Sequence, residues 1–307
     1  MLSVLIFVLL IFSSASELIS AESQKLDRVR IGYSSISSSR IALWVTSEMD
    51  FFRKNGLAAE TIVTPGVQGT QALIAGELQF YLGGVDSAAL AVSRGSDLVA
   101  LATAEPIEYK LIAQPEIKTV KELRGKKIVV DRVGGTSYYI SLQILEKVGL
   151  KSADVELVQV GGGGNQRVAA FKSGLVAGVV TSPDRFEQMK IPYLLAGYAT
   201  SRSYLATHRL SAVKFMRGLM KSIKRIKSDR PYAERILGQY IKSNDAELLR
   251  LALDQQVRIL PDLPYAPEEG MKTILEDLSR SVPEARRLPP SALIDNTVVS
   301  DALKSRL

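Results

Sequence analysis

The stretch ALIAGELQFYLG, residues Ala72–Gly83, decides the fold because a second stretch, AFKSGLVAGVVT at Ala170–Thr181, repeats its pattern. In both, a helix-like run ends at a glycine, Gly76 or Gly174, and an apolar strand-like run follows. The chain therefore contains two similar halves. Two α/β halves that face one another form a cleft, and such a cleft is a natural place to enclose a small molecule.

The likeness between the halves extends upstream of both stretches. The strands VRIGYSS (Val29–Ser35) and KKIVVDR (Lys126–Arg132) each lead into a loop of small and hydroxyl residues and then a helix. We expect the first of these helices over 39–54, and the two helices stop at Gly56 and Gly149. The alternating order predicts an α/β fold in which each half has a mainly parallel sheet flanked by helices.

The two halves are expected to be joined by two crossovers. A strand is predicted at Leu98–Thr103, and residues 104–118, with prolines as breaks, form the first crossover. A return strand is predicted at Leu194–Tyr198. The first lobe is then discontinuous, and the second lobe is a continuous insertion.

After about Ser201 helices dominate, and we expect them to pack back onto the first lobe. The predicted helices cover 210–228, 231–241, 246–259 and 267–281. The predicted division is a signal peptide at 1–21, the first part of lobe 1 at 28–104, lobe 2 at 105–198, and the return to lobe 1 with the C-terminal helices at 199–307.

Composition excludes several classes of site. A chain of 307 residues with 46% hydrophobic and 23% charged residues is typical of a soluble globular protein. It has no cysteine, which excludes disulfides, thiolate metal sites, cysteine nucleophiles and a cysteine-anchored lipoprotein. The apolar run LSVLIFVLLIF (Leu2–Phe12) followed by small and polar residues predicts an export signal, cleaved after Ala15 or Ala21. The alternative is an uncleaved hydrophobic anchor.

The net charge of +7 and the pI of about 9.4 do not by themselves indicate a nucleic-acid partner. The densest basic residues, between Lys214 and Lys227, alternate with an apolar stripe at helical spacing, which favours the solvated face of a packed helix. Zinc-finger and aromatic ribonucleoprotein motifs are absent from the sequence. We therefore expect no nucleic-acid partner.

Five loops at the carboxyl ends of predicted strands are rich in small and hydroxyl residues, and each precedes a helix. Ligands of open α/β sheets lie at this edge, where free N–H groups and the helix dipole favour an anionic or strongly polar group. The ligand contacts predicted from these loops are Ser35, Ser38, Arg40, Gly69, Thr70, Gly84, Ser87, Arg132, Gly135, Thr136, Ser137, Tyr138 and Asn165.

Arg40 and Arg132 are the charged candidates because each follows the first strand of a half. An arginine fork can pair with a carboxylate or sulfonate, although a solvated or ion-paired arginine is the alternative. Trp44 can line the cleft or pack in the core, and helical periodicity favours the core. Asp86 can accept a ligand amine or cap its helix, and the cap is favoured.

The sequence shows no catalytic or cofactor-binding pattern. GGGGN is not followed by Gly-Lys-Ser/Thr, and Arg167 replaces the third glycine of the dinucleotide fingerprint. His208 is the single histidine and lies outside the five loops, so no nucleophile–base pair or ordinary zinc site is visible. We predict no catalytic residue, no metal and no cofactor.

Six segments together resemble a known family. The first four are ALWVTSEMDFFRKNGL (Ala42–Leu57), QGTQALIAGELQF, IKTVKELRGKKIVVDRVGGTSY and VGGGGNQRVAAFKSGLVAGVVTSPD. The last two, near the C-terminus, are TSRSYLATHRLSAVKFMRGLMKSI and IDNTVVSDAL. All six resemble the solute-binding proteins of nitrate/sulfonate/taurine-type ABC importers. That family includes the group named for thiamine-pyrimidine synthesis proteins. The resemblance covers about residues 28–303. Val176-Ala177 departs from the family, which commonly has an acidic residue before the alanine.

The resemblance implies a periplasmic-binding fold of the second type, with hinge segments near Thr103–Pro106 and Gly197–Ser201. It also implies an exported, periplasmic, monomeric receptor that closes on a small organic anion or heteroaromatic molecule and docks on a membrane permease. The alternatives are an enzyme of cofactor biosynthesis on the same scaffold and a ligand-sensing module. The cysteine-rich motif of the pyrimidine synthases is missing, which disfavours the enzyme.

Overall fold

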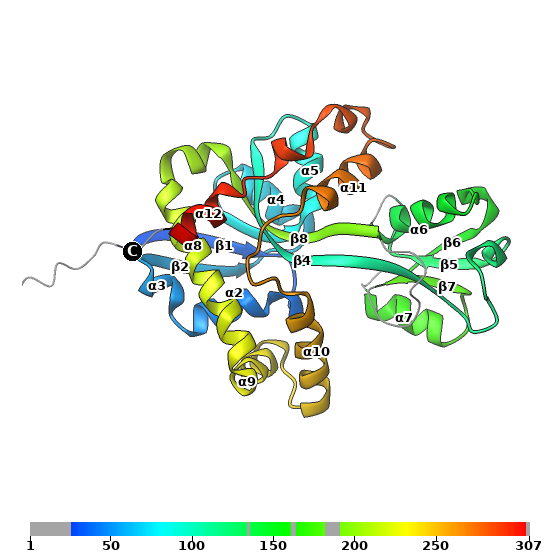
Figure 1. The fold of residues 1–307 in the computed structure, drawn as a ribbon, viewed down its shortest axis with the longest axis horizontal. Helices are drawn as coiled ribbons and strands as arrows, with labels where there is room; N and C mark the ends of the chain where they lie inside the picture. The colour runs from blue at the N-terminus through cyan, green and yellow to red at the C-terminus, as the bar shows by residue number, and fades with distance from the viewer. Residues whose placement is uncertain (1–25, 134–135, 161–163, 182–190, 305–307) are drawn as a thin grey trace, which may run out of the picture.

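Two lobes joined by a pair of long strands make up the structure (Figure 1). The computed structural model describes residues 26–133, 136–160, 164–181 and 191–304. One run of strands, in the order β2-β1-β3-β8-β4-β7-β5-β6, passes through both lobes. The predicted signal peptide at 1–21 lies outside the described residues.

Lobe 1 begins with three parallel strands, β1 (Asp27–Tyr33), β2 (Leu57–Val63) and β3 (Phe80–Gly84). The helix expected over 39–54 is broken, because Asp50 adopts a left-handed conformation with φ 56°. The helical elements that follow these strands are η1 (Ser38–Arg40), α2 (Ile41–Glu48), α3 (Phe51–Lys54), α4 (Gly66–Ile74) and α5 (Val85–Ser93).

The two lobes are connected by strands rather than by loops. β4 (Leu98–Ala113) and β8 (Ile191–Ser201) pair antiparallel, from Leu98 opposite Ser201 to Tyr109 opposite Ile191. The predicted strand end at Thr103 is therefore wrong, since β4 continues to Ala113 and itself makes the crossover expected at 104–118. Pro106 is tolerated inside the strand because the pairing register shifts there, where a missing N–H costs least.

Lobe 2 continues the sheet with β7 (Gly178–Thr181), antiparallel to β4, and with β5 (Lys127–Val130) and β6 (Glu156–Gln159), parallel to β7 and to each other. The sheet is thus mixed in both lobes, with parallel and antiparallel strand pairs in each. The helical elements here are η2 (Val120–Leu123), α6 (Thr136–Lys147), η3 (Ser152–Asp154) and α7 (Gly164–Lys172).

Strand directions place the two sets of carboxyl ends opposite each other. β8 runs antiparallel to both β3 and β4, so β1, β2 and β3 point the same way as β4, toward lobe 2. β7 runs antiparallel to β4, so β5, β6 and β7 point back toward lobe 1. The loops that begin helices in the two lobes therefore face one another.

The C-terminal helices build most of lobe 1. α8, α9, α10 and α12 share one hydrophobic core with β1 and β3, and Phe215 of α8 stacks on Phe80 and Phe52 with ring centroids 4.1 and 5.6 Å apart. Aromatic pairs of this kind add about 0.5–1.5 kcal/mol beyond burial. The helical bounds are α8 (Arg202–Ser228), α9 (Arg230–Ile241), α10 (Ala246–Ile259), α11 (Glu268–Leu278), η4 (Pro283–Arg287), η5 (Pro290–Leu293) and α12 (Thr297–Lys304).

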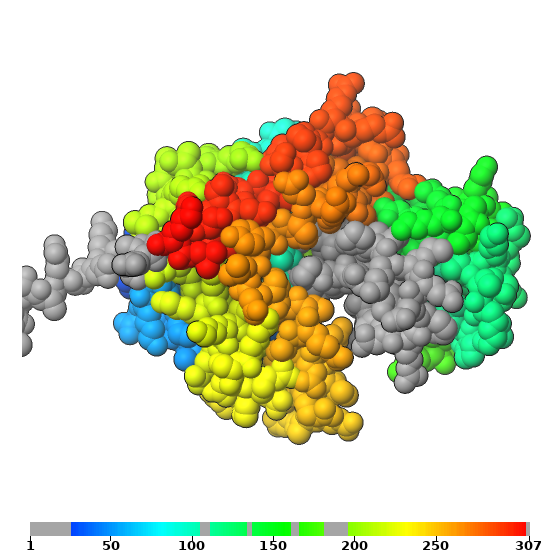
Figure 2. Space-filling view, viewed as in Figure 1, coloured from blue at the N-terminus to red at the C-terminus, as the bar shows by residue number. Residues whose placement is uncertain are grey.

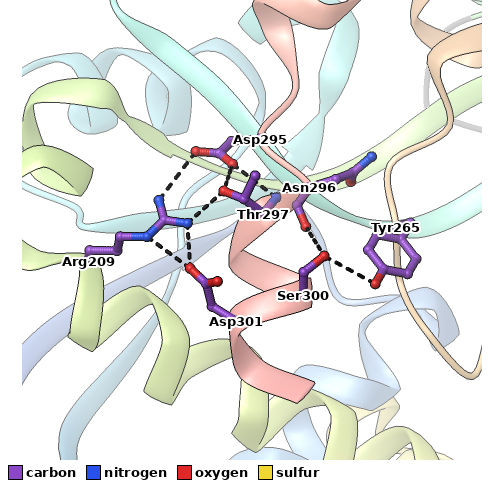
Figure 3. A network of polar contacts seen from close by, with 7 residues as sticks. All are labelled: Arg209, Tyr265, Asp295, Asn296, Thr297, Ser300 and Asp301. Carbon is purple, nitrogen blue, oxygen red and sulfur yellow. Dashed lines mark hydrogen bonds and ion pairs between the residues drawn. The ribbon is translucent and has the colours of Figure 1, made fainter. Parts of the chain in front are cut away.

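A polar network fixes α12 against α8 (Figure 3). Arg209 of α8 contacts Asp301 at 2.6 Å, Thr297 at 2.6 Å and Asp295 at 3.6 Å. Next to it, the Asn296 side chain donates to the carbonyl of Ala266 and accepts from its N–H, which ties the loop after α10 to the same place. The last helix is thus held by the Arg209 side chain of α8 and by the backbone of the loop after α10.

α11 packs on both lobes. Its apolar face shares a core with α5 of lobe 1 and with Ile140 and Ile144 of α6 in lobe 2. Arg280 pairs with both oxygens of Glu146 at 2.8 and 2.9 Å, and the Gln143 amide donates to buried Asp277. The lobes therefore meet at a third place besides β4 and β8.

The Asp277 contact predicts a pH-dependent stability. Burial raises the pKa of Asp277 to about 6, partly opposed by the Gln143 hydrogen bond and the charge of Arg280. The folded state then binds the Asp277 proton more tightly than the unfolded state. Ionisation of Asp277 therefore lowers the free energy of unfolding above pH 6, and this cost disappears as pH falls from about 6 to 4. Asp277→Asn should raise the free energy of unfolding at pH 7.5 by up to about 3 kcal/mol.

Chemical denaturation at pH 7.5, 6 and 4.5 measures this gain, which should shrink at each step toward acid. Glu269→Gln is the matched control, because Glu269 is an exposed acid on the same helix and is not among the charges that shift the pKa of Asp277. A gain for Asp277→Asn that is the same at all three pH values would contradict the assignment.

Candidate functional site

The candidate site lies where the carboxyl ends of the strands in the two lobes face each other. In lobe 1, three segments converge there: the serine-rich loop after β1, the turn at Thr64–Gly66 after β2, and the turn into α5 after β3. This edge is the place where open α/β sheets bind ligands. Figure 2 shows α10, coloured gold, at the lower border of lobe 1, with the green atoms of the second lobe to its right.

Arg40 is the charged centre of the lobe 1 side. Its side chain is only 6% exposed, and Nη2 donates to Ser34 Oγ at 3.0 Å. The hydroxyls of the loop also contact each other, with Ser37 Oγ 2.8 Å from Ser39 Oγ and 3.4 Å from Ser35 Oγ. The side chain of Ser38 accepts from Gln256 Nε2 of α10 at 3.3 Å. The loop thus places a buried cation among hydroxyl groups.

Two buried tyrosines lie within the electrostatic range of Arg40. Burial raises the pKa of Tyr81 to about 12, although the charge of Arg40 and the contact with Ser34 lower it. Burial also raises the pKa of Tyr198 above its usual range, again opposed by Arg40. Both hydroxyls remain protonated at any physiological pH. The charge of Asp86 also acts on Tyr81, so this region holds a cation and an anion together with hydroxyl groups.

The two helices that start at this edge have no side-chain cap. The N-cap residues are Pro65 for α4 and Gly84 for α5, and neither donates or accepts through a side chain. Asp86, expected to cap α5, instead lies within its first turn and accepts from the N–H of Ser87 at 2.8 Å. First-turn N–H groups of this kind favour an anion, as does the end of the helix dipole.

The structure explains by packing alone why position 69 is a glycine. A β-carbon at Gly69 would lie 2.0 Å from the ring of Tyr81, and one at Gly83 would lie 2.1 Å from it. The ring of Tyr81 therefore fills the space that a side chain would need. Thr70, beside Gly69, is 5% exposed, and its hydroxyl has no hydrogen-bond partner among the described residues.

The lobe 2 side is built differently. Arg132 is exposed, in contrast to Arg40. Ser137 Oγ donates to Asp131 Oδ1 at 2.7 Å and accepts from the N–H of Asp131 at 2.8 Å, so its proton is committed within the lobe. The ring of Tyr138 meets that of Tyr139 edge to face, with centroids 5.4 Å apart.

Three further predicted contacts of lobe 2 are placed only in part. Thr136 begins α6 and Asn165 is the second residue of α7, which puts both at helix starts on the facing edge. Their side chains and Gly135 lie outside the described residues. All thirteen predicted contacts stay predictions, although the lobe 1 members lie at one sheet edge.

Two other aromatic residues are accounted for by packing. Trp44 is 1% exposed and stacks on Tyr240 with centroids 4.6 Å apart, as the helical periodicity indicates. His208 lies at the amino-terminal edge of the lobe 1 sheet, stacked on Tyr204 at 4.7 Å and bonded to Thr207 Oγ1 at 2.7 Å. Neither residue joins the candidate site.

Sequence reasoning missed Tyr81, Tyr198 and Gln256 at this edge. Each lies in a run that reads as an ordinary strand or amphipathic helix, so no local pattern distinguishes it. The nearest signal was the pair Gly83-Gly84 beside an aromatic residue in a strand, since strand glycines mark a close approach of another group.

Metal and membrane features were sought in the part of the chain that the structure describes. No group of three or more histidine, aspartate and glutamate side chains there is arranged to hold a metal ion. Among the described helices, none combines the length and apolar character needed to cross a bilayer.

The architecture defines a class: it is the type II fold of periplasmic binding proteins. The aliphatic sulphonate-binding protein SsuA of Escherichia coli aligns with a TM-score of 0.68 at 19% identity, covering 87% of this chain and 98% of that one. SsuA of Xanthomonas axonopodis pv. citri, bound to MOPS, gives 0.60 at 18% identity over 91% and 98%. The nitrate-binding protein NrtA of Synechocystis PCC 6803 gives 0.64 at 11% identity over 91% and 89%.

The family model described as NMT1/THI5 like matches residues 38–230, and the chain belongs to this family. The resemblance noted from the sequence is thereby confirmed. Comparison with curated protein sequences gives no match.

A substitution at Gly69 tests whether the Tyr81 ring occupies the space beside it. Gly→Ala inside a helix normally stabilises by about 1 kcal/mol. At Gly69 the added methyl group meets the Tyr81 ring, and crowding of this kind costs about 1–3 kcal/mol. Gly69→Ala should therefore lower the melting temperature.

The control is Gly178→Ala, whose new methyl group would have neighbours no closer than 3.4 Å. That variant should melt within a few degrees of the unmodified protein. A Gly69→Ala variant that melts higher than the parent would show that the Tyr81 ring does not occupy this space.

Proposed function

We propose that this protein is the solute-binding component of an ABC importer of the sulfonate/nitrate type. It captures a small organic anion or heteroaromatic molecule, of sulfonate-, nitrate-, taurine- or pyrimidine-like chemistry, between its lobes. The family membership and the fold shared with SsuA and NrtA support this class. The ligand-loaded form would then deliver its cargo to a permease in the membrane.

The observation that carries the proposal is the buried cation of Arg40 at the facing edge. Arg40 is buried at this edge, where its Nη2 donates to Ser34 Oγ, and a guanidinium at a ligand-binding edge can pair with an anion. Its planar fork matches a carboxylate or sulfonate, while nearby hydroxyls and first-turn N–H groups supply further donors. Ser35, Thr70 and Ser87 would assist from lobe 1.

Closure of the lobes completes the mechanism. Register shifts between Ala100 and Pro106 interrupt the β4–β8 ladder, and such irregular places bend more easily than a regular ladder. Bending there would bring Arg132, Thr136, Ser137 and Tyr138 of lobe 2 against a ligand held by lobe 1. The predicted hinge segments, Thr103–Pro106 and Gly197–Ser201, lie in β4 and β8.

The proposed role is non-enzymatic. His208, the sole histidine, lies at the opposite edge of the lobe 1 sheet, so it supplies no base to the site. The protein would be exported by its N-terminal segment, act outside the cytoplasm as a monomer, and require no cofactor. An enzyme of cofactor biosynthesis on this scaffold is the alternative, and turnover of a bound compound seen by mass spectrometry would favour it.

A binding panel tests the proposal directly. Thermal shift followed by calorimetry is run with nitrate, taurine, MOPS, the 1-alkanesulfonates from ethane to octane, pyrimidines and aromatic acids. At least one should raise the melting temperature, because a ligand that binds only the folded state stabilises it. If no compound of the panel raises the melting temperature, the result would count against a receptor.

Arg40 supplies the mutational test. Arg40→Gln should weaken an anionic ligand by about 1–3 kcal/mol, which is roughly tenfold to a hundredfold in Kd, because a charge-assisted hydrogen bond is lost. Arg94→Gln is the control, since Arg94 is an exposed arginine at the end of α5. Calorimetry is done on variants whose melting temperature shows them folded. Equal affinity of Arg40→Gln and Arg94→Gln would remove Arg40 from the site.

A further inference from the structure

Tyr81 of β3 is enclosed by glycines from three different elements. A β-carbon at Gly32 of β1, Gly69 of α4 or Gly83 of β3 would lie within 3.0 Å of a Tyr81 ring atom. The residue is 3% exposed. The ring packs closely against the backbone on three sides because these residues have no side chains. Its position at the end of the central strands is therefore fixed.

The hydroxyl of Tyr81 reaches beyond the ring to the turn after β2. It lies 3.1 Å from the carbonyl oxygen of Thr64 and 3.0 Å from that of Gly66. A phenol has a single proton, so the two carbonyls share or alternate this donor. Gly66 has φ 52°, a conformation that ordinary side chains rarely adopt, and it begins α4.

The turn held in this way carries predicted ligand contacts. α4 starts directly from it without a side-chain cap, and its second turn contains Gly69 and Thr70. The same turn is joined to the end of β1, because the N–H of Thr64 donates to the carbonyl of Tyr33 at 2.9 Å, and the next residue, Ser34, accepts from Arg40 at 3.0 Å. The turn that Tyr81 holds is thus connected to the loop after β1.

We propose that Tyr81 is a positioning residue of the ligand site, which holds the start of α4 and the Arg40 loop in the arrangement that binds an anion. The inference rests on the proposed function, and it assigns a role to a residue that does not itself contact the ligand. The phenol acts through the two carbonyls, while the ring supplies the fixed point from which they are held.

Tyr81→Phe tests the proposal, because phenylalanine keeps the ring among the glycines and removes only the hydroxyl. Hydrogen exchange on the ligand-free variant should show faster exchange at the amides of Gly66–Thr70. Calorimetry with 1-pentanesulfonate, taurine and nitrate should show roughly tenfold weaker binding of those that the parent binds. The melting temperature should stay within a few degrees.

Two further variants separate positioning from general stability. Tyr240→Phe removes another hydrogen-bonded hydroxyl of the same lobe, one that donates to Glu48 at 2.9 Å outside the candidate site, and should change neither exchange at Gly66–Thr70 nor affinity. Tyr81→4-aminophenylalanine restores an N–H donor at the same point and should recover both. A purely structural role would not show this recovery at constant melting temperature.

The exchange experiment needs no ligand, so it separates failure of this proposal from failure of the proposed function. Unchanged exchange in Tyr81→Phe overturns the positioning role whatever the panel gives. Faster exchange with unaltered affinity overturns it as well. Weaker binding with unaltered exchange would instead place the hydroxyl in direct contact with the ligand.

Discussion

The antiparallel pairing of β4 with β8 is the constraint on which the rest of the structure depends. Both strands run through both lobes, and each lobe adds its parallel strands to one edge of this pair. Their directions oblige the carboxyl ends of β1 and β3 to face those of β5 and β7. Strand pairing therefore places between the lobes the two sheet edges at which α/β sheets bind ligands, before any side chain of the loops is considered.

Specificity then depends on what the loops carry, and the two lobes contribute unequally. Lobe 1 presents a buried guanidinium with hydroxyls and helix starts around it. Lobe 2 presents an exposed arginine and a serine whose proton is already donated to Asp131. This asymmetry supports an order of events in which lobe 1 holds the ligand first and lobe 2 closes onto it. α11, packed on both lobes, limits how they move relative to each other.

Much of the fold could be predicted from the sequence, because repeated βα units, glycine stops and helical stripes are local signals. The length of β4 could not, since Pro106 reads as a break and only its partner strand shows that a register shift accommodates it. The break at Asp50 was also missed, because aspartate can adopt the left-handed conformation and nothing in the sequence around it shows that it does so here. Gly69 was predicted as a ligand contact, and that stays a prediction. The structure shows that the Tyr81 ring fills the space beside it, and because Tyr81 belongs to another element, one sequence does not reveal that contact.

The central claim is that an anion bound at the Arg40 side draws the lobes together by bending at β4 and β8. The chain has no cysteine, so Glu247→Cys on α10 and Lys172→Cys on α7 give two unique spin-label sites on exposed residues, one in each lobe (Figure 1). Pulsed electron resonance measures the distance distribution between the labels, with and without the panel anion that stabilises the protein. If the lobes close on the anion, the distribution of distances between the labels is shorter and narrower with the anion than without it. An identical distribution in both states, at saturating anion, would contradict this claim.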